Sequence, residues 1–218
     1  MIERLISILI GYVCGNFLSG YFYGKKHDVD IRKSGSGNIG TTNTLRTLGK
    51  KAGLLALIGD SLKAILASVI VYFIYRNTDA SSIQLLMLYA GFGAILGHDF
   101  PFFMKFKGGK GIATSFGMII ICFPQTLPIC AIAFFGAVFA TRFVSLGSIL
   151  AAIAFGVQAI VMGYMGLLWY EGVELYEAII IAVIIAVCAI VQHRSNIVRL
   201  INGNENKISL KGAGKNGN

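Results

Sequence analysis

Six long apolar runs constrain the fold of this chain more than any other feature of its sequence. They cover residues 5–23, 54–75, 83–97, 112–140, 146–170 and 178–191. Each is long enough for a helix, and several reach the roughly 20 residues that a membrane-spanning helix needs. Only 13% of the 218 residues are charged, whereas a soluble domain carries about a quarter. The sequence therefore predicts an all-α integral membrane protein with a single membrane domain over residues 1–218.

The fourth run is too long for one ordinary helix and carries two prolines near its centre. Pro124 and Pro128 each remove a backbone donor, and proline breaks a helix at interior positions. The run is therefore expected to form two short helices, at about 112–123 and 126–141. This gives seven transmembrane helices in total.

The distribution of cations predicts how these helices are oriented. With seven crossings, the basic segments 25–51, 105–110, 142 and 194–218 all fall on one side. Cytoplasmic loops are enriched in Lys and Arg, so we expect the N-terminus outside and the C-terminus in the cytoplasm. The two short helices could also form a re-entrant pair, which satisfies the same parity.

Four polar segments would then share the cytoplasmic face. They cover residues 25–52, 98–111, 141–146 and 192–206. The net charge of +9 is concentrated in such short segments between apolar runs. This pattern indicates contact with a bilayer surface rather than with nucleic acid.

The first polar segment contains the sequence RKSGSGNIGTTNTLR at residues 32–46. Its glycines allow several backbone N–H groups to turn toward one point, and its hydroxyl and amide side chains add short donors. Arg32, Lys33 and Arg46 supply positive charge. This composition favours binding of an oxyanion such as phosphate.

A second glycine-rich stretch, GGKG at residues 108–111, directly precedes an apolar run. Unpaired N–H groups at a helix start favour an anion, and Lys110 adds a charge there. Two anion sites on one face predict a pair of phosphorylated substrates. The alternative is that Lys105, Lys107 and Lys110 anchor the protein to anionic lipid headgroups, which does not explain the glycines.

Ionisable residues at the ends of apolar runs, or within them, are further candidates. His193 and Asn196 lie three residues apart, so both side chains can point the same way. His193 is a candidate general base or substrate donor, with interfacial packing as the alternative. Asp60 and Lys63 have the same spacing inside an apolar run, which favours a structural ion pair over a role in lining the site. His98 ends another run, where a structural role and a functional role are both compatible with its position.

Three familiar kinds of site do not fit the sequence. Gly35, Gly37 and Gly40 match G-x-G-x-x-G, but they follow a polar segment rather than a strand. The GGKG stretch lacks the first glycine and the Ser or Thr of a P-loop. The four cysteines lie inside apolar runs without C-x-x-C spacing, so we expect neither a metal nor a disulfide.

Three motifs, GSGNIGTTNTLR, GHDFPFFMKFKGGKGIATS and HRSNIVRLINGNE, occur in this order and closely resemble those of the acyl-phosphate:glycerol-3-phosphate acyltransferase (PlsY) family. The resemblance covers almost the whole chain, including TRFVSLGSI at residues 141–149. Thr41 and Gly147 stand where the family commonly has alanine, and both are small residues that leave the resemblance intact.

The resemblance implies an enzyme of the bacterial inner membrane that works at the cytoplasmic face without a cofactor or metal. It would transfer a fatty acyl group from acyl phosphate to the 1-hydroxyl of sn-glycerol 3-phosphate, giving lysophosphatidic acid and phosphate. A cytosolic enzyme that forms acyl phosphate would be its functional partner.

The resemblance also implies roles for individual residues. The implied catalytic residues are Ser36, His193, Asn196 and Arg46. The implied substrate and phosphate ligands are Asn38, Thr42, Asn43, Lys105, Lys107, Gly108, Gly109, Lys110, Gly111, Arg194 and Glu205. Further candidates are Asp60, Lys63, His98 and Ser145. We expect glycerol 3-phosphate at residues 108–111 and acyl phosphate at the first segment, although the two sites could be exchanged.

Two mechanisms are compatible with these residues. Ser36 could attack first and form an acyl-enzyme with His193 as base, or the substrate hydroxyl could attack directly. Direct attack is favoured because acyl phosphate is already an activated anhydride. The H-x-x-x-x-D motif of thioester-using acyltransferases is absent.

Two other functions fit parts of the sequence. A transporter of a phosphorylated small solute is the main alternative, because broken helices and glycine amides also form transport sites. The gathering of cationic candidates on one face argues against it. A lipid-binding scaffold would leave Ser36, His193 and Asn196 unexplained.

Overall fold

The computed structural model describes residues 1–78 and 83–208, whose regular secondary structure is helical and includes no strand. Its α-helices are α1 (Ile2–Gly15), α2 (Ser19–Lys26), α3 (Thr41–Tyr75), α4 (Ile83–Asp99), α5 (Ile112–Cys122), α6 (Leu127–Thr141), α7 (Val144–Tyr164), α8 (Gly172–Gln192) and α9 (Arg194–Ile201). Short 3-10 helices lie at η1 (Ile31–Lys33), η2 (Phe102–Met104) and η3 (Pro124–Thr126).

The apolar helices confirm the predicted class of protein, an all-α membrane protein. Within the described residues, six helical stretches are long and apolar enough to cross a membrane, and α5 is a shorter apolar helix. At about 1.5 Å per residue, the 11 residues of α5 extend over roughly half of a 30 Å hydrocarbon core. The count of seven crossings and the orientation of the termini stay predictions.

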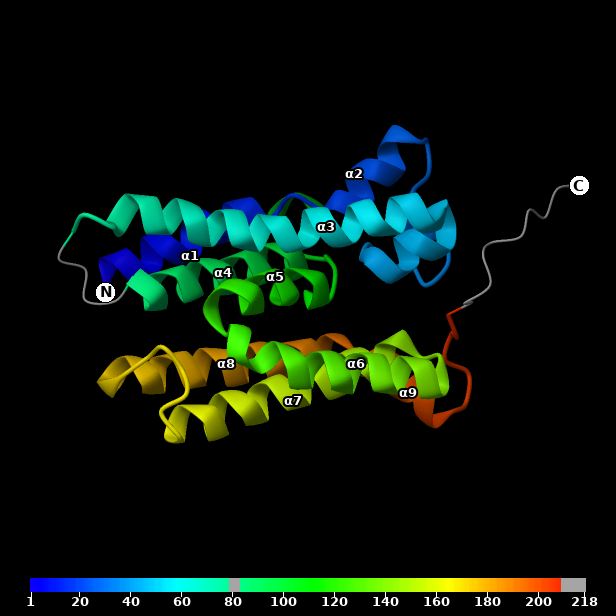
Figure 1. The fold of residues 1–218 in the computed structure, drawn as a ribbon. Helices are drawn as coiled ribbons and strands as arrows, with labels where there is room; N and C mark the ends of the chain where they lie inside the picture. Colours follow the sequence, from blue (N-terminus) through cyan, green and yellow to red (C-terminus); the bar gives the residue numbers. More distant parts are fainter. Residues whose placement is uncertain (79–82, 209–218) are drawn as a thin grey trace, which may run out of the picture.

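The helices form two groups that lie side by side (Figure 1). In the first group, α1 packs on α4, and α3 packs on both α4 and α5. In the second group, α7 packs between α6 and α8. The chain passes from one group to the other through η3, and α4 and α8 also touch. Arg4 on α1 adds a two-pronged contact across the groups, donating to both carboxylate oxygens of Glu177 on α8 at 2.8 and 2.9 Å.

Glycines allow α1 and α4 to approach each other closely. A Cβ atom at Gly11 would overlap the backbone oxygen of Ala90, and one at Gly93 would overlap that of Ile8. Lipid tails are as apolar as the helices, so packing of small residues is a main source of helix association in a bilayer. The α1–α4 pair therefore depends on the absence of side chains at these positions.

The break between α5 and α6 lies where the two prolines predicted it. Pro124 and its neighbours form η3 instead of continuing the helix. Side chains from the second group satisfy carbonyls near the break: the Tyr170 hydroxyl donates to the Cys122 oxygen at 3.2 Å, and Gln158 Nε2 donates to the Thr126 oxygen at 3.3 Å. Irregular backbone at membrane depth needs such partners because no water is available there.

Two of the polar segments contain more helix than the sequence indicated. α3 begins at Thr41, inside segment 25–52, and its helical geometry is interrupted at Gly49, where φ is +86°. Segment 192–206 contains the two-turn helix α9. The kink at Gly49 separates the polar first turns of α3 from the apolar remainder of the helix. The hydrophobic pattern detects only the apolar remainder, so it places the start of the helix too late in the chain.

Candidate active site

The polar segments meet at one end of the bundle, on the right in Figure 1, where α2, the start of α3 and α9 lie. Contacts join the segments there. Lys110 Nζ from the second segment donates to Asn196 Oδ1 of the fourth. Arg46 Nη2 from the first segment donates to the backbone oxygen of Asn206 at 3.0 Å. Segments far apart in sequence thus form one polar region.

Asn43 organises the glycine-rich loop of the first segment from a buried position on α3. Its Oδ1 accepts the Ser36 N–H at 2.8 Å, and its Nδ2 donates to the carbonyls of Ile31 and Ser34, each at 3.0 Å. Gly35 precedes Ser36 with a φ of +59°. Both N–H donors of the Asn43 amide are therefore used within the protein, where they hold the loop in place, and substrate binding by Asn43 stays a prediction.

The same loop presents other predicted residues at its surface. Ser36 is exposed, and Asn38 and Thr42 are half-buried. Asn38 Oδ1 accepts the Gly40 N–H at 2.8 Å, just before α3 begins. No side chain caps α3, so its first-turn N–H groups and the Ser36 hydroxyl can face a bound anion together.

The glycines of the second segment pack against the end of α4. The Gly108 N–H donates to the Asp99 oxygen and the Gly109 N–H to the His98 oxygen, both at 3.0 Å. A Cβ at Gly109 would overlap the His98 ring, and Gly111 has a φ of +69°. These glycines are required by close packing and by the turn. Carbonyls at the end of α4 engage the N–H groups of Gly108 and Gly109, and phosphate binding by these two residues stays a prediction.

Anion-binding capacity in the second segment instead lies at Lys110 and the start of α5. No side chain caps α5, so the N–H groups of its first turn are available to an anion. Lys110 immediately precedes the Gly111 N-cap. The helix start and the ammonium group therefore act at the same place.

A chain of hydrogen bonds extends from Lys110 across α9. Asn196, which accepts from Lys110, donates through Nδ2 to Glu205 Oε1 at 2.9 Å. Arg199 Nε donates to Glu205 Oε2 at 2.8 Å. Asn196 and Glu205 are buried. Arg199 was not among the predicted site residues, although its position three residues after Asn196 on the same helix could have indicated it.

The positive charges in this region influence one another. Burial, together with the nearby Arg199 and Arg46 guanidinium groups, lowers the pKa of Lys110 to about 8, against the opposing effect of Glu205. Burial and the Lys110 charge lower the pKa of His193 to about 4. His193 is therefore neutral at pH 7, while Lys110 is mostly charged.

The hydrogen bond of His193 determines which ring nitrogen is free. Nδ1 lies 2.7 Å from the Ala189 carbonyl oxygen, and a carbonyl can only accept. Neutral His193 thus carries its proton on Nδ1 and a lone pair on Nε2. This is the tautomer that a proton acceptor needs.

The remaining predicted residues do not join the Lys110 network. Lys105, Lys107 and Arg194 are exposed. Ser145 is buried near the α6–α7 turn, and its hydroxyl has no partner in the part of the chain that the structure describes. The turn itself contacts the chain just after the fourth segment, because the Ile208 N–H donates to the Arg142 oxygen at 2.9 Å.

Asp60, Lys63 and His98 form a separate, buried cluster. Lys63 Nζ lies 3.1 Å from Asp60 Oδ1, as the i, i+3 spacing predicted, and it also contacts His98 Nδ1 at 2.6 Å. The described residues contain no group of three His, Cys, Asp or Glu side chains placed to hold a metal.

These features define a multi-pass helical membrane protein with a cationic polar region at one end of the bundle. A family model described as glycerol-3-phosphate acyltransferase matches residues 5–203. The chain belongs to the glycerol-3-phosphate acyltransferase family.

Individual relatives agree with this assignment. A glycerol-3-phosphate acyltransferase of Macrococcus caseolyticus is 39% identical over 94% of this chain and 97% of its own length. A glycerol-3-phosphate acyltransferase of Syntrophomonas wolfei is 37% identical over 96% of this chain and 99% of its own length. The crystal structure of PlsY (YgiH), an integral membrane glycerol 3-phosphate acyltransferase, in its glycerol 3-phosphate form has a TM-score of 0.80 and 32% identity, covering 94% of this chain and 96% of that one. Its lysophosphatidic acid form has a TM-score of 0.77 and 30% identity.

Proposed function

We propose that this acyltransferase moves a fatty acyl group from acyl phosphate to the 1-hydroxyl of sn-glycerol 3-phosphate, releasing lysophosphatidic acid and phosphate. Family membership supports the acceptor, and the similar PlsY structures are described in glycerol 3-phosphate and lysophosphatidic acid forms. The observation that carries the proposal is the placement of Lys110 at the uncapped start of α5, hydrogen-bonded to Asn196 and electrostatically coupled to neutral His193.

Two anionic substrates must lie close together, and the site supplies positive charge for both. Lys110 with the start of α5 forms the proposed glycerol 3-phosphate site. The Ser36 loop with the start of α3 forms the proposed acyl phosphate site. Arg46 is tied to the fourth segment through Asn206 and lies close enough to Lys110 to influence its pKa. A cation between the two proposed sites would offset the repulsion between the two phosphates.

The chemistry needs little beyond alignment and proton removal. The acceptor hydroxyl oxygen attacks the carbonyl carbon of acyl phosphate, the bond from that carbon to the phosphate oxygen breaks, and phosphate leaves with the electron pair. Nε2 of His193 accepts a hydrogen bond from the hydroxyl. A histidine with a pKa near 4 is a weak base, so the departing phosphate takes up the proton at the end. Holding the reactants together accounts for several kcal/mol of the lowered barrier.

The location follows from the same segments. Cations gather at the end of the bundle that carries the site, and cytoplasmic surfaces carry such an excess. We infer that the site faces the cytoplasm at a bacterial inner membrane. A soluble enzyme that forms acyl phosphate would then deliver its product directly to this surface.

The decisive experiment measures phosphate release by detergent-purified protein given palmitoyl phosphate, with and without glycerol 3-phosphate. The expected result is release that depends on glycerol 3-phosphate and matches the lysophosphatidic acid formed. Lys110→Ala should abolish it, whereas Arg76→Ala, which removes an exposed cation at the other end of α3, should not. Absence of acceptor-dependent release, with labelled glycerol 3-phosphate crossing proteoliposome membranes instead, would replace the enzyme by a transporter.

The role of Ser36 separates the two mechanisms. Under direct attack, protein mixed with palmitoyl phosphate alone acquires no acyl group, and Ser36→Ala lowers turnover by weakening substrate alignment. Intact-protein mass spectrometry checks this. A stoichiometric acyl adduct on Ser36 would establish the acyl-enzyme route instead.

A further inference from the structure

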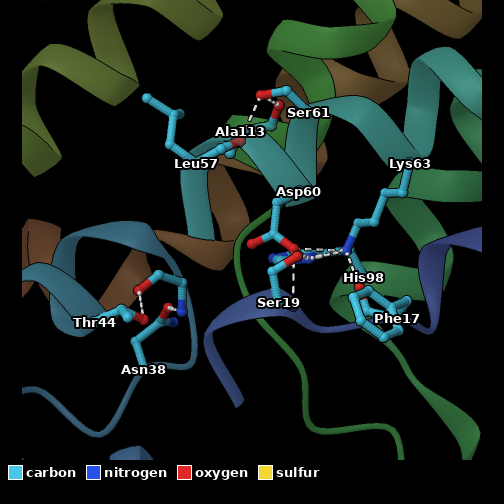
Figure 2. Close-up of polar contacts among 11 residues, drawn as sticks. Phe17, Ser19, Asn38, Thr44, Leu57, Asp60, Ser61, Lys63, His98 and Ala113 are labelled. Atoms are coloured by element: carbon cyan, nitrogen blue, oxygen red, sulfur yellow. Dashed lines mark hydrogen bonds and ion pairs between the residues drawn. The ribbon is translucent and has the colours of Figure 1, made fainter. Parts of the chain in front are cut away.

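A charged cluster lies inside the first helix group, apart from the Lys110 network. Asp60 and Lys63 come from the middle of α3 and His98 from the end of α4, and their side chains are 1%, 4% and 3% exposed. Figure 2 shows Lys63 reaching toward Asp60, His98 and the backbone of Phe17. Charged side chains within a membrane segment are costly and rare unless they have a function. A simple ion pair between Asp60 and Lys63 leaves the contact with His98 unexplained.

The contacts of Lys63 determine the protonation of His98. Nζ lies 3.0 Å from the Phe17 oxygen, 3.1 Å from Asp60 Oδ1 and 2.6 Å from His98 Nδ1. An ammonium group has three N–H donors, and these three acceptors use all of them. The Asp60 carboxylate and the Phe17 oxygen favour a cation on Lys63, and an ammonium group can only donate. His98 Nδ1 therefore accepts, and neutral His98 carries its proton on Nε2.

The Nε2 edge of His98 faces the second glycine-rich segment. A Cβ at Gly109 would overlap Nε2, and the His98 backbone oxygen accepts the Gly109 N–H. Lys110 is the next residue, and α5 begins two residues later. The carboxyl group of Asp99, the residue after His98, lies against Gly111 and interacts with Gln192. The Nε2–H group is thus a buried donor at the side of the loop that holds Lys110.

We propose that His98 Nε2–H donates a hydrogen bond to the phosphate bound at the Lys110 site, and that Lys63 with Asp60 are positioning residues that hold His98 in this tautomer. The inference rests on the proposed function, since the ligand is taken to be a phosphate monoester or an acyl phosphate. The two histidines then have opposite roles: His193 presents a lone pair at Nε2, and His98 presents a proton there.

Nitrogen NMR of the histidine rings tests this assignment without catalysis. The chain has only three histidines, so ¹⁵N-histidine labelling in detergent gives few signals, and His98→Gln identifies those of His98. We expect a neutral ring with protonated Nε2 whose signal shifts when glycerol 3-phosphate is added alone. A parallel titration with a non-reactive acyl phosphonate shows which phosphate the site holds. In Lys63→Met, the preference for the Nε2–H tautomer should be lost.

Several outcomes would overturn the inference. These are a ring with its proton on Nδ1, an imidazolium ring at pH 7, or a His98 signal that neither ligand moves at saturation. If the protein still shows acceptor-dependent phosphate release in that case, only the role of His98 fails. If the His98 signal moves but no acyl transfer occurs, the phosphate site stands and the proposed reaction fails.

Kinetics provide a second test that a purely structural role would not pass. His98→Phe keeps a ring but loses the hydrogen-bond donor. For the phosphate substrate that shifts the NMR signal, it should raise the KM about 10- to 100-fold, the usual effect of losing a hydrogen bond to a charged group. His98→Gln keeps an N–H donor and should restore part of this loss. Equal KM values in the wild type and both variants, with only kcat or thermal stability reduced, would assign His98 to packing alone.

Discussion

The pKa of Lys110 makes a quantitative prediction for the pH dependence of the enzyme. Burial and the neighbouring guanidinium groups lower this pKa to about 8, and the ammonium form is the one that binds a phosphate. With that pKa, about 90% of Lys110 is charged at pH 7 and about 10% at pH 9. Since kcat/KM reports ionisation of the free enzyme, kcat/KM for glycerol 3-phosphate should fall about tenfold between these pH values.

His193 and the substrate phosphate should not produce this decline. His193, with a pKa of about 4, stays neutral from pH 7 to 9, and a phosphate monoester, with a second pKa near 6, is already a dianion. The assay measures initial rates of lysophosphatidic acid formation at limiting glycerol 3-phosphate, with uncatalysed hydrolysis subtracted. Lys110→Arg is the matched variant, because arginine stays charged throughout. Its activity is expected to be lower but independent of pH. A wild-type profile that is flat to pH 9.5, or an equal decline in Lys110→Arg, would refute the reasoning.

Three further predictions concern the residues that support the site. Glu205→Ala removes the acceptor of both Asn196 and Arg199 and should destabilise the fourth segment by about 2 to 3 kcal/mol. The variant should show a lower thermal midpoint and lose activity. Glu205→Gln should have a milder effect, and equal effects of the two variants would argue against a charge-based role. Asn43→Ala leaves two carbonyls and the Ser36 N–H without their hydrogen-bond partner. Each lost hydrogen bond should cost about 1 kcal/mol or more of stability, so acyl transfer should nearly disappear. Normal activity would show that the loop forms without the Asn43 side chain. Gly11→Leu should lower the thermal midpoint, because overpacking of the helix contact costs about 1 to 3 kcal/mol. Gly136→Leu should leave the midpoint unchanged, because added atoms meet open space there. Equal midpoints for the two variants would contradict the packing argument.

Much of the architecture could be predicted because its causes are local in the sequence. Apolar runs indicate membrane helices whatever surrounds them, since backbone groups in a bilayer must be satisfied within the helix. The α5–α6 break follows from the chemistry of Pro124 and Pro128 alone. The i, i+3 spacing similarly predicted the contact between Asp60 and Lys63, which the structure confirms. The polar segments could be assigned to one end because helix parity and cation distribution agree.

The roles of individual polar residues could not be predicted in the same way, because the local sequence pattern does not specify their hydrogen-bond partners. Asn43 reads as a substrate ligand until its amide is seen to hold the carbonyls of Ile31 and Ser34. Gly108 and Gly109 read as phosphate amides until the end of α4 is seen to accept both N–H groups.

The sequence by itself determined the class of protein, the helix breaks and the motifs that carry phosphate chemistry, because each follows from hydrophobicity, proline or glycine at a known position. Only the tertiary structure decided which hydrogen-bond donors are already bonded inside the protein and which are left free for a ligand. It brought Arg199 to Glu205 and the Nδ1 atom of His98 to Lys63. A hydrogen bond needs a donor and an acceptor, and in this chain the second of these groups often belongs to another helix.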